Sequence, residues 1–160
     1  MAFSYVRKKY AKELLDKFNK KNCNTINTPV AADLKLTRGG EGKIIDPALF
    51  RSLIGSLRYL SITRPDIVYS VCLLSKYKEK PKESHWLAVK RILRYIKGTM
   101  DFSLLYSYNN DATLYGYSNN DWRGDQDERK RKQSTGYVYY LRSTAFTWIS
   151  KKQSIVALSI

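Results

Sequence analysis

A row of basic residues in the second third of the sequence is the part best suited to bind a polyanion. Lys90, Arg94 and Lys97 recur at intervals of four and three residues, so a helix would bring them to one face, with Arg91 beside them. Each Lys or Arg side chain that contacts a phosphate backbone releases counterions and adds to the affinity. The competing interpretation is a solvated helix face without a ligand.

A second group of cations is a run of four consecutive residues, Arg129, Lys130, Arg131 and Lys132. Adjacent positive charges in a loop produce a local potential that attracts polyanions, which favours a phosphate clamp or a nuclear localisation signal. A solvated hairpin loop explains the same run at least as well, because the flanking Asp, Glu, Ser, Thr and Gly residues are typical of a surface turn.

The acidic residues that precede this run could bind magnesium only if several of them converged from separate elements. Asn119 and Asp121 begin the cluster, but Arg123 stands where a calcium loop of the EF-hand type needs an oxygen ligand. Since the acids lie in one loop, we expect them to form salt bridges with the neighbouring basic run. No metal site is predicted, and His85, the only histidine, is interpreted as a residue in the first turn of a helix.

The overall charge favours nucleic acid as the partner. The 160 residues include 29 Lys and Arg against 14 Asp and Glu, and the net charge of +15 exceeds what a neutral partner would require. A basic surface that serves solubility or an anionic membrane is the alternative. No apolar stretch reaches the roughly 18 residues of a membrane span, so we expect no membrane partner and a location in the cytoplasm or nucleus.

The basic row needs a helix to position it, and the sequence predicts four helices before residue 100. In each of them the apolar residues recur at helical spacing. The four stretches are 6–20, 46–62, 63–80 and 84–98. Asp46 followed by Pro47 is typical of a helix start, with Asp as the N-cap and Pro as the first helical residue.

Three further residues are expected to mark helix ends. Thr63 lies three residues before Asp66, which is the spacing of a capping box, and Ser84 is expected to cap the helix that carries the basic row. Gly98 is expected to end that helix in the left-handed conformation.

After Met100 the pattern changes to strands rich in β-branched and aromatic residues. The predicted strands are 102–108, 113–118, 137–141 and 145–149, and the last two are expected to pair through the turn at 142–144. We therefore predict an α+β protein with a helical segment over residues 1–110 and an antiparallel three-stranded sheet over residues 111–160. A sheet of three strands without covering helices should leave an apolar face exposed.

Seven separated blocks of the sequence carry further information through their order and spacing. They are YAKELLDKF (10–18), CNTINTP (23–29), FRSLIGSLRYLSITRPDI (50–67), WLAVKRILRYIKG (86–98), GYSNNDWRGD (116–125), STGYVYYL (134–141) and TAFTWISKKQSIVALS (144–159). The first four resemble the end of the reverse transcriptase in Pol polyproteins of copia-type retrotransposons. The last three resemble the first three strands of the ribonuclease H domain of the same polyproteins.

The resemblance implies a thumb-like or connection-like helical segment followed by a truncated ribonuclease H sheet. It also implies two partners, an RNA/DNA hybrid or other nucleic acid and the remainder of a Pol polyprotein, and it implies magnesium as the cofactor of the family. The polymerase carboxylates of the family lie upstream of the blocks found here, so we expect no DNA synthesis from this chain.

The ribonuclease H block departs from the family at its metal site. The family pattern is Ser-Asp-x-Asp-Trp, whereas Asn119 stands at the first Asp position and Asp121 is the one remaining candidate. The catalytic glutamate of the family follows the last block, beyond Ile160. Because magnesium depends on anionic oxygens, we expect neither a bound metal nor a cofactor in this chain and no hydrolysis of RNA.

Two functions are therefore considered from the sequence. The first is an inactive fragment of a copia-type Pol polyprotein that retains at most a surface for RNA or DNA. The second is a non-enzymatic nucleic-acid-binding protein retained by a host, which would use the face of Lys90, Arg94 and Lys97.

Overall fold

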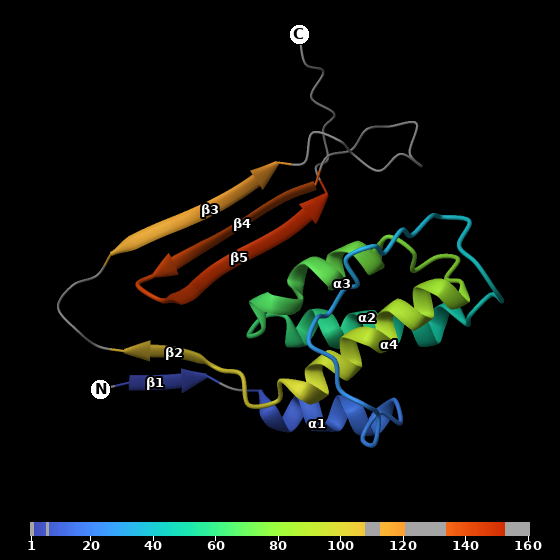
Figure 1. Ribbon diagram of the computed structural model, residues 1–160, viewed down its shortest axis with the longest axis horizontal. Helices are drawn as coiled ribbons and strands as arrows, with labels where there is room; N and C mark the ends of the chain where they lie inside the picture. Colours follow the sequence, from blue (N-terminus) through green and yellow to red (C-terminus); the bar gives the residue numbers. More distant parts are fainter. Residues whose placement is uncertain (1, 6, 108–112, 121–133, 153–160) are drawn as a thin grey trace, which may run out of the picture. The chain divides into compact units, whose positions relative to one another are not determined.

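The computed structural model describes residues 2–5, 7–107, 113–120 and 134–152 and divides them between two compact units (Figure 1). Residues 4–104 form a helical unit. The second unit consists of residues 105–160 together with the first three residues, and its described core is a sheet. The predicted α+β class is confirmed.

The helical unit contains four α-helices and one short 3-10 helix. They are α1 (Lys8–Lys17), α2 (Pro47–Leu60), η1 (Pro65–Ile67), α3 (Val68–Ser75) and α4 (Glu83–Gly98). The strands are β1 (Ala2–Tyr5), β2 (Leu104–Ser107), β3 (Leu114–Asn120), β4 (Ser134–Leu141) and β5 (Thr144–Lys152). None of the described helices is long and apolar enough to cross a lipid bilayer.

All four α-helices contribute to the core of the helical unit, and α1 and α3 each pack against both α2 and α4. The apolar side chains that recur at helical spacing are buried in it, among them Leu14, Leu15, Phe50, Leu53, Leu57, Val71, Leu74, Val89, Ile92, Leu93 and Ile96. Full burial of one such side chain contributes about 1.5–3 kcal/mol, so this cluster is the main source of stability in the unit.

The start of α2 confirms the prediction from Asp46 and Pro47. The carboxylate Oδ1 of Asp46 accepts a hydrogen bond of 2.8 Å from the backbone N–H of Ala48, and Pro47 is the first helical residue. The capping box expected at Thr63 is wrong. The Thr63 hydroxyl donates back to the carbonyl of Leu60, and the helix predicted to extend to residue 80 begins as η1 and ends at Ser75.

Both ends of α4 also differ from the prediction. The helix begins at Glu83, and Ser84 Oγ instead accepts a hydrogen bond from the backbone N–H of Glu41, which belongs to the loop before α2. Gly98 lies within the last turn and is not left-handed. A Cβ atom at Gly98 would lie 3.1 Å from Cβ of Thr25, so this position is small because another segment passes close to it.

The sheet unit contains three antiparallel strands in the order β3, β4, β5. Arg142, with a φ of 59°, lies in the turn between β4 and β5, and a bulge interrupts their pairing between Tyr139 and Tyr140. Tyr115 of β3 stacks on Tyr140 of β4 with 5.2 Å between the ring centroids. Large apolar side chains are exposed on β3, β4 and β5, namely Leu114, Tyr115, Tyr117, Tyr139, Leu141, Phe146 and Ile149.

Candidate nucleic-acid interface

The predicted basic row lies on α4, but its side chains are half-buried and bind a neighbouring segment of the same chain. Arg91 donates from Nε to the carbonyl oxygen of Thr28 (3.2 Å) and from Nη2 to the hydroxyl of Thr28 (2.9 Å). Arg94 Nε donates to the carbonyl oxygen of Asn24 (2.8 Å). Three bonds from two arginines thus fix a segment of chain that runs along α4.

The end of α4 completes this attachment. Lys97 Nζ donates to the carbonyl oxygen of Cys23 (2.7 Å), and Thr25 lies against Gly98. We call residues 23–28, which these contacts hold, the strap. The strap runs antiparallel to α4, because its first residue meets Lys97 near the end of the helix and its last residue meets Arg91.

The fourth cation of the row, Lys90, has a different contact. Its Nζ lies 5.5 Å from the centroid of the Trp86 ring, within reach of a cation–π interaction. Within the described residues, none of the four cations forms an ion pair with a carboxylate. The row therefore keeps its positive charge, although Arg91, Arg94 and Lys97 donate hydrogen bonds to neutral oxygens of the strap.

The other predicted site residues can be followed only in part. Asp121 and the run Arg129, Lys130, Arg131 and Lys132 lie outside the described residues. Asn119 is exposed on β3 and pairs with Gly136 of β4. In the described part of the chain, no three or more His, Cys, Asp or Glu residues gather where they could hold a metal ion.

A second basic surface, which the sequence analysis did not single out, lies on α2. Arg51, Ser52, Gly55, Arg58 and Tyr59 are all exposed, and we call these residues the α2 face. A Cβ atom added at Gly55 would meet no atom within 4 Å. A Gly in an exposed helix interior costs about 1 kcal/mol relative to Ala, and nothing within the molecule requires it here.

Lys17 of α1 and Arg7, the residue just before this helix, support the rim of the α2 face. Lys17 Nζ donates to Ser52 Oγ (3.2 Å). The Arg7 guanidinium lies 4.1 Å from the centroid of the Tyr59 ring and donates to the Tyr59 carbonyl oxygen (3.1 Å). Within the described residues, the guanidinium groups of Arg51 and Arg58 have neither a hydrogen-bond partner nor an ionic partner. In the sequence, the α2 face is indicated by a Gly inside a strongly periodic helix, with one Arg four residues before it and another three residues after it.

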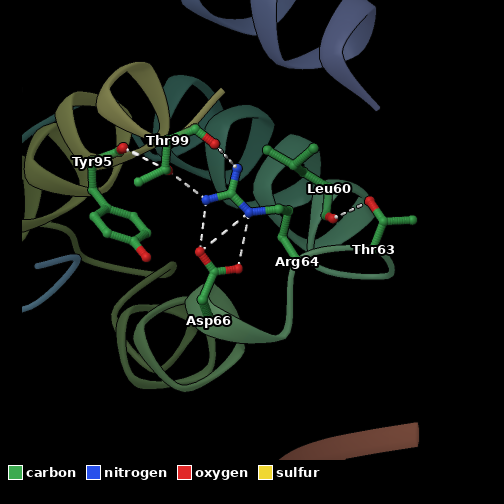
Figure 2. A network of polar contacts seen from close by, with 6 residues as sticks. All are labelled: Leu60, Thr63, Arg64, Asp66, Tyr95 and Thr99. Atoms are coloured by element: carbon green, nitrogen blue, oxygen red, sulfur yellow. Dashed lines mark hydrogen bonds and ion pairs between the residues drawn. The ribbon is translucent and has the colours of Figure 1, made fainter. Parts of the chain in front are cut away.

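A buried polar network ties the end of α2 to the end of α4 (Figure 2). Arg64 Nε and Nη2 donate to the two carboxylate oxygens of Asp66 (2.9 and 2.6 Å), while Nη1 and Nη2 donate to the carbonyl oxygen and hydroxyl of Thr99 (3.0 and 2.6 Å). The guanidinium also lies within 6 Å of the ring centroids of Tyr95 and Phe102. Burial raises the pKa of Tyr95, and the nearby Asp66 carboxylate raises it further.

His85 holds the loop before α2 against the start of α4. Its ring is fully buried and stacks on Tyr77 with 4.0 Å between the centroids. Nδ1 accepts from the backbone N–H of Lys82 (3.0 Å), so the neutral ring carries its proton on Nε2, which donates to the Thr37 carbonyl oxygen (2.9 Å). Burial lowers the pKa of His85, and Lys82 lowers it further against the opposing effect of the Thr37 carbonyl.

Comparison with known proteins identifies long Pol polyproteins that match nearly the whole chain. This chain is 39% identical over 153 residues to the retrovirus-related Pol polyprotein from transposon RE2 of Arabidopsis thaliana, and the match covers 96% of this chain and 10% of that protein. The polyprotein from transposon TNT 1-94 of Nicotiana tabacum is also 39% identical, over 96% of this chain and 12% of its own length. The chain thus spans about a tenth of the length of these relatives.

A shorter relative also matches. An uncharacterized mitochondrial protein of Arabidopsis thaliana is 33% identical over 94% of this chain and 62% of its own length. No protein-family model matches the chain, and no solved structure matches it.

Proposed function

Because the chain belongs to the family of copia-type retrotransposon Pol polyproteins, we propose that it joins the end of the reverse transcriptase to the start of the ribonuclease H domain and binds an RNA/DNA hybrid. In this proposal residues 1–110 are the reverse transcriptase segment and residues 111–160 the ribonuclease H segment. The site of action is the cytoplasm or nucleus, where the polyprotein meets its nucleic acid.

The α2 face is the observation that carries the binding proposal. Arg51 and Arg58 are seven residues apart on α2, or roughly 10 Å along the helix axis, so they can meet separate phosphates. Gly55 lies between them without a side chain, which lets a sugar-phosphate backbone approach the helix closely. The free donors of both arginines suit phosphate oxygens, with which guanidinium groups form strong charge-assisted bonds.

The same proposal assigns no catalysis to residues 1–160. An amide at Asn119 supplies no negative charge where the family has a carboxylate, and divalent cations bind hard anionic oxygens. The chain is therefore proposed to hold nucleic acid without hydrolysing it and to need no magnesium for that binding.

Binding and cleavage can be tested separately with a fluorescent RNA/DNA hybrid. Arg51→Ala combined with Arg58→Ala should make the plot of log affinity against log salt shallower by about 0.9 for each lost phosphate contact. Lys78→Ala combined with Lys80→Ala removes the same charge from exposed positions between α3 and α4 and should leave the slope unchanged. Equal slopes for the two double variants would refute the assignment of the α2 face.

The cleavage arm uses the unaltered chain with magnesium. No shortening of the RNA strand is expected at any time point. Release of RNA fragments that stops when the chain is heat-denatured would contradict the proposed inactivity, whereas failure of the unaltered chain to bind the hybrid would contradict the proposed function itself.

A further inference from the structure

The strap accepts hydrogen bonds from the cations of α4 through groups that carry no negative charge. The acceptors for Arg91, Arg94 and Lys97 are three backbone carbonyl oxygens and one hydroxyl, all neutral. Within the described residues these cations have no carboxylate partner, and Nη1 and Nη2 of Arg94 have no partner of any kind. A row of uncompensated positive charge is thus covered by a segment that cannot neutralise it.

We propose that α4 carries a second, latent site for the phosphate backbone of nucleic acid, and that the strap is its internal competitor. The inference rests on the proposed function, because it assumes that the chain meets nucleic acid at the α2 face. When the strap leaves, Arg91, Arg94 and Lys97 become available to phosphates along roughly 9 Å of the helix. Nucleic acid and the strap then exclude each other.

Electrostatics favours the phosphates in this competition. A phosphate oxygen carries formal charge and forms shorter, stronger bonds with guanidinium and ammonium groups than a neutral carbonyl does. Each cation that contacts the backbone also releases a condensed counterion, a gain that the strap does not provide. The strap nevertheless has the advantage of being tethered next to the row, which raises its effective concentration.

The strap is attached in a way that allows release. Its side chains Asn24, Thr25, Asn27 and Thr28 are exposed, so they contribute little burial. Ile26 is the strap residue that packs against the core, and it is only partly buried. Most of the attachment therefore resides in the same hydrogen bonds that phosphates would replace.

A reversible covalent lock tests the inference within one protein. A Cβ atom at Gly98 would lie 3.1 Å from Thr25 Cβ, within about half an ångström of the roughly 3.5–4.5 Å that a disulfide requires. We would combine Thr25→Cys with Gly98→Cys in the 160-residue chain, with its native cysteines replaced by Cys23→Ser and Cys72→Ser. Cys23 contributes its carbonyl oxygen rather than its thiol to the strap.

The readout is the salt dependence of binding to the RNA/DNA hybrid, with the lock oxidised and reduced. The reduced form should bind more tightly, and its slope should be steeper by about 0.9 for each phosphate that reaches α4, up to three. The parent without the engineered cysteines should not respond to reductant. Equal affinities and slopes for the two forms would overturn the inference and leave the α2 face untouched, whereas no binding by either form would overturn both proposals.

A second variant covers the case in which the lock does not form. Ile26→Ser removes the apolar anchor of the strap and should steepen the slope of the otherwise unaltered chain. Adding Arg94→Ala and Lys97→Ala to Ile26→Ser should remove this gain. A slope for Ile26→Ser equal to that of the unaltered chain would count against the latent site.

Discussion

Replacement of Arg64 by Ala is expected to destabilise the helical unit by about 3 kcal/mol. Breaking a buried ion pair by removing one partner costs about 3–5 kcal/mol. The lower end applies here because 28% of the Asp66 side chain is exposed and can regain water, whereas the Arg64 side chain is only 7% exposed. Thr99 loses both of its contacts to the guanidinium at the same time.

The loss is large relative to the stability of a domain of this size, which is typically about 5–15 kcal/mol. Arg64→Lys keeps the charge but cannot reproduce the paired bonds to the carboxylate, because an ammonium is not a planar fork. We expect it to cost about 1.5–3 kcal/mol, the contribution of a hydrogen bond to a charged group. The order of stability is therefore unaltered chain, Arg64→Lys, Arg64→Ala.

Urea unfolding followed by far-ultraviolet circular dichroism measures these differences, because all described α-helices belong to the helical unit. A double-mutant cycle with Asp66→Asn isolates the pairwise part, for which we expect a coupling of about 1–3 kcal/mol. A coupling below about 0.5 kcal/mol, the usual deviation from additivity of independent sites, would refute the view that the two residues act as a pair.

Three further outcomes follow from single residues. Burial keeps the folded-state pKa of His85 below its usual value of 6.5. The free energy of unfolding should therefore be at its full value above about pH 6.5 and decline as the pH falls from there towards the lowered pKa. His85→Gln should abolish this decline in urea titrations. Gly55→Ala should raise the free energy of unfolding by about 1 kcal/mol, since the added methyl meets open space, and an unchanged or lowered value would show that the helix needs this Gly. Asn119→Asp should increase manganese affinity in calorimetric titrations without restoring RNA cleavage, and unchanged affinity would argue against a metal role for this position.

The helices were predictable wherever one face of a stretch meets the core. Leu53 and Leu57 of α2 and Ile92 and Ile96 of α4 are fully buried, as their spacing of four residues required. The cap at Asp46 was also predictable, because its partner is two residues away in the chain. Contacts of this kind are local and leave a signal in the sequence.

The helix ends that depend on distant segments could not be predicted. The hydroxyl of Ser84 bonds to Glu41, 43 residues earlier, and Gly98 accommodates Thr25 rather than a left-handed turn. Ser and Gly have the same local preferences in both situations, so the tertiary partner decides their role.

The predicted basic row illustrates the same limit for the site. Helical spacing indicated correctly that Lys90, Arg94 and Lys97 lie near one another on α4, and it could not reveal that a loop with no regular structure of its own runs along them. The role of these residues in binding nucleic acid stays a prediction. The α2 face was not predicted, because a Gly within a periodic helical pattern does not show by itself that open space surrounds its position, as it does at Gly55.

Attachment of the strap through main-chain oxygens determines which mutations this segment can tolerate during evolution. Because every residue type offers the same carbonyl group, the identities of Asn24 and Asn27 are free to drift without loss of docking. Insertion or deletion of a single residue between Cys23 and Thr28 would disrupt docking, because it would shift the carbonyl acceptors by about 3.5 Å relative to their donors on α4. Length, more than composition, is what selection would preserve in this stretch.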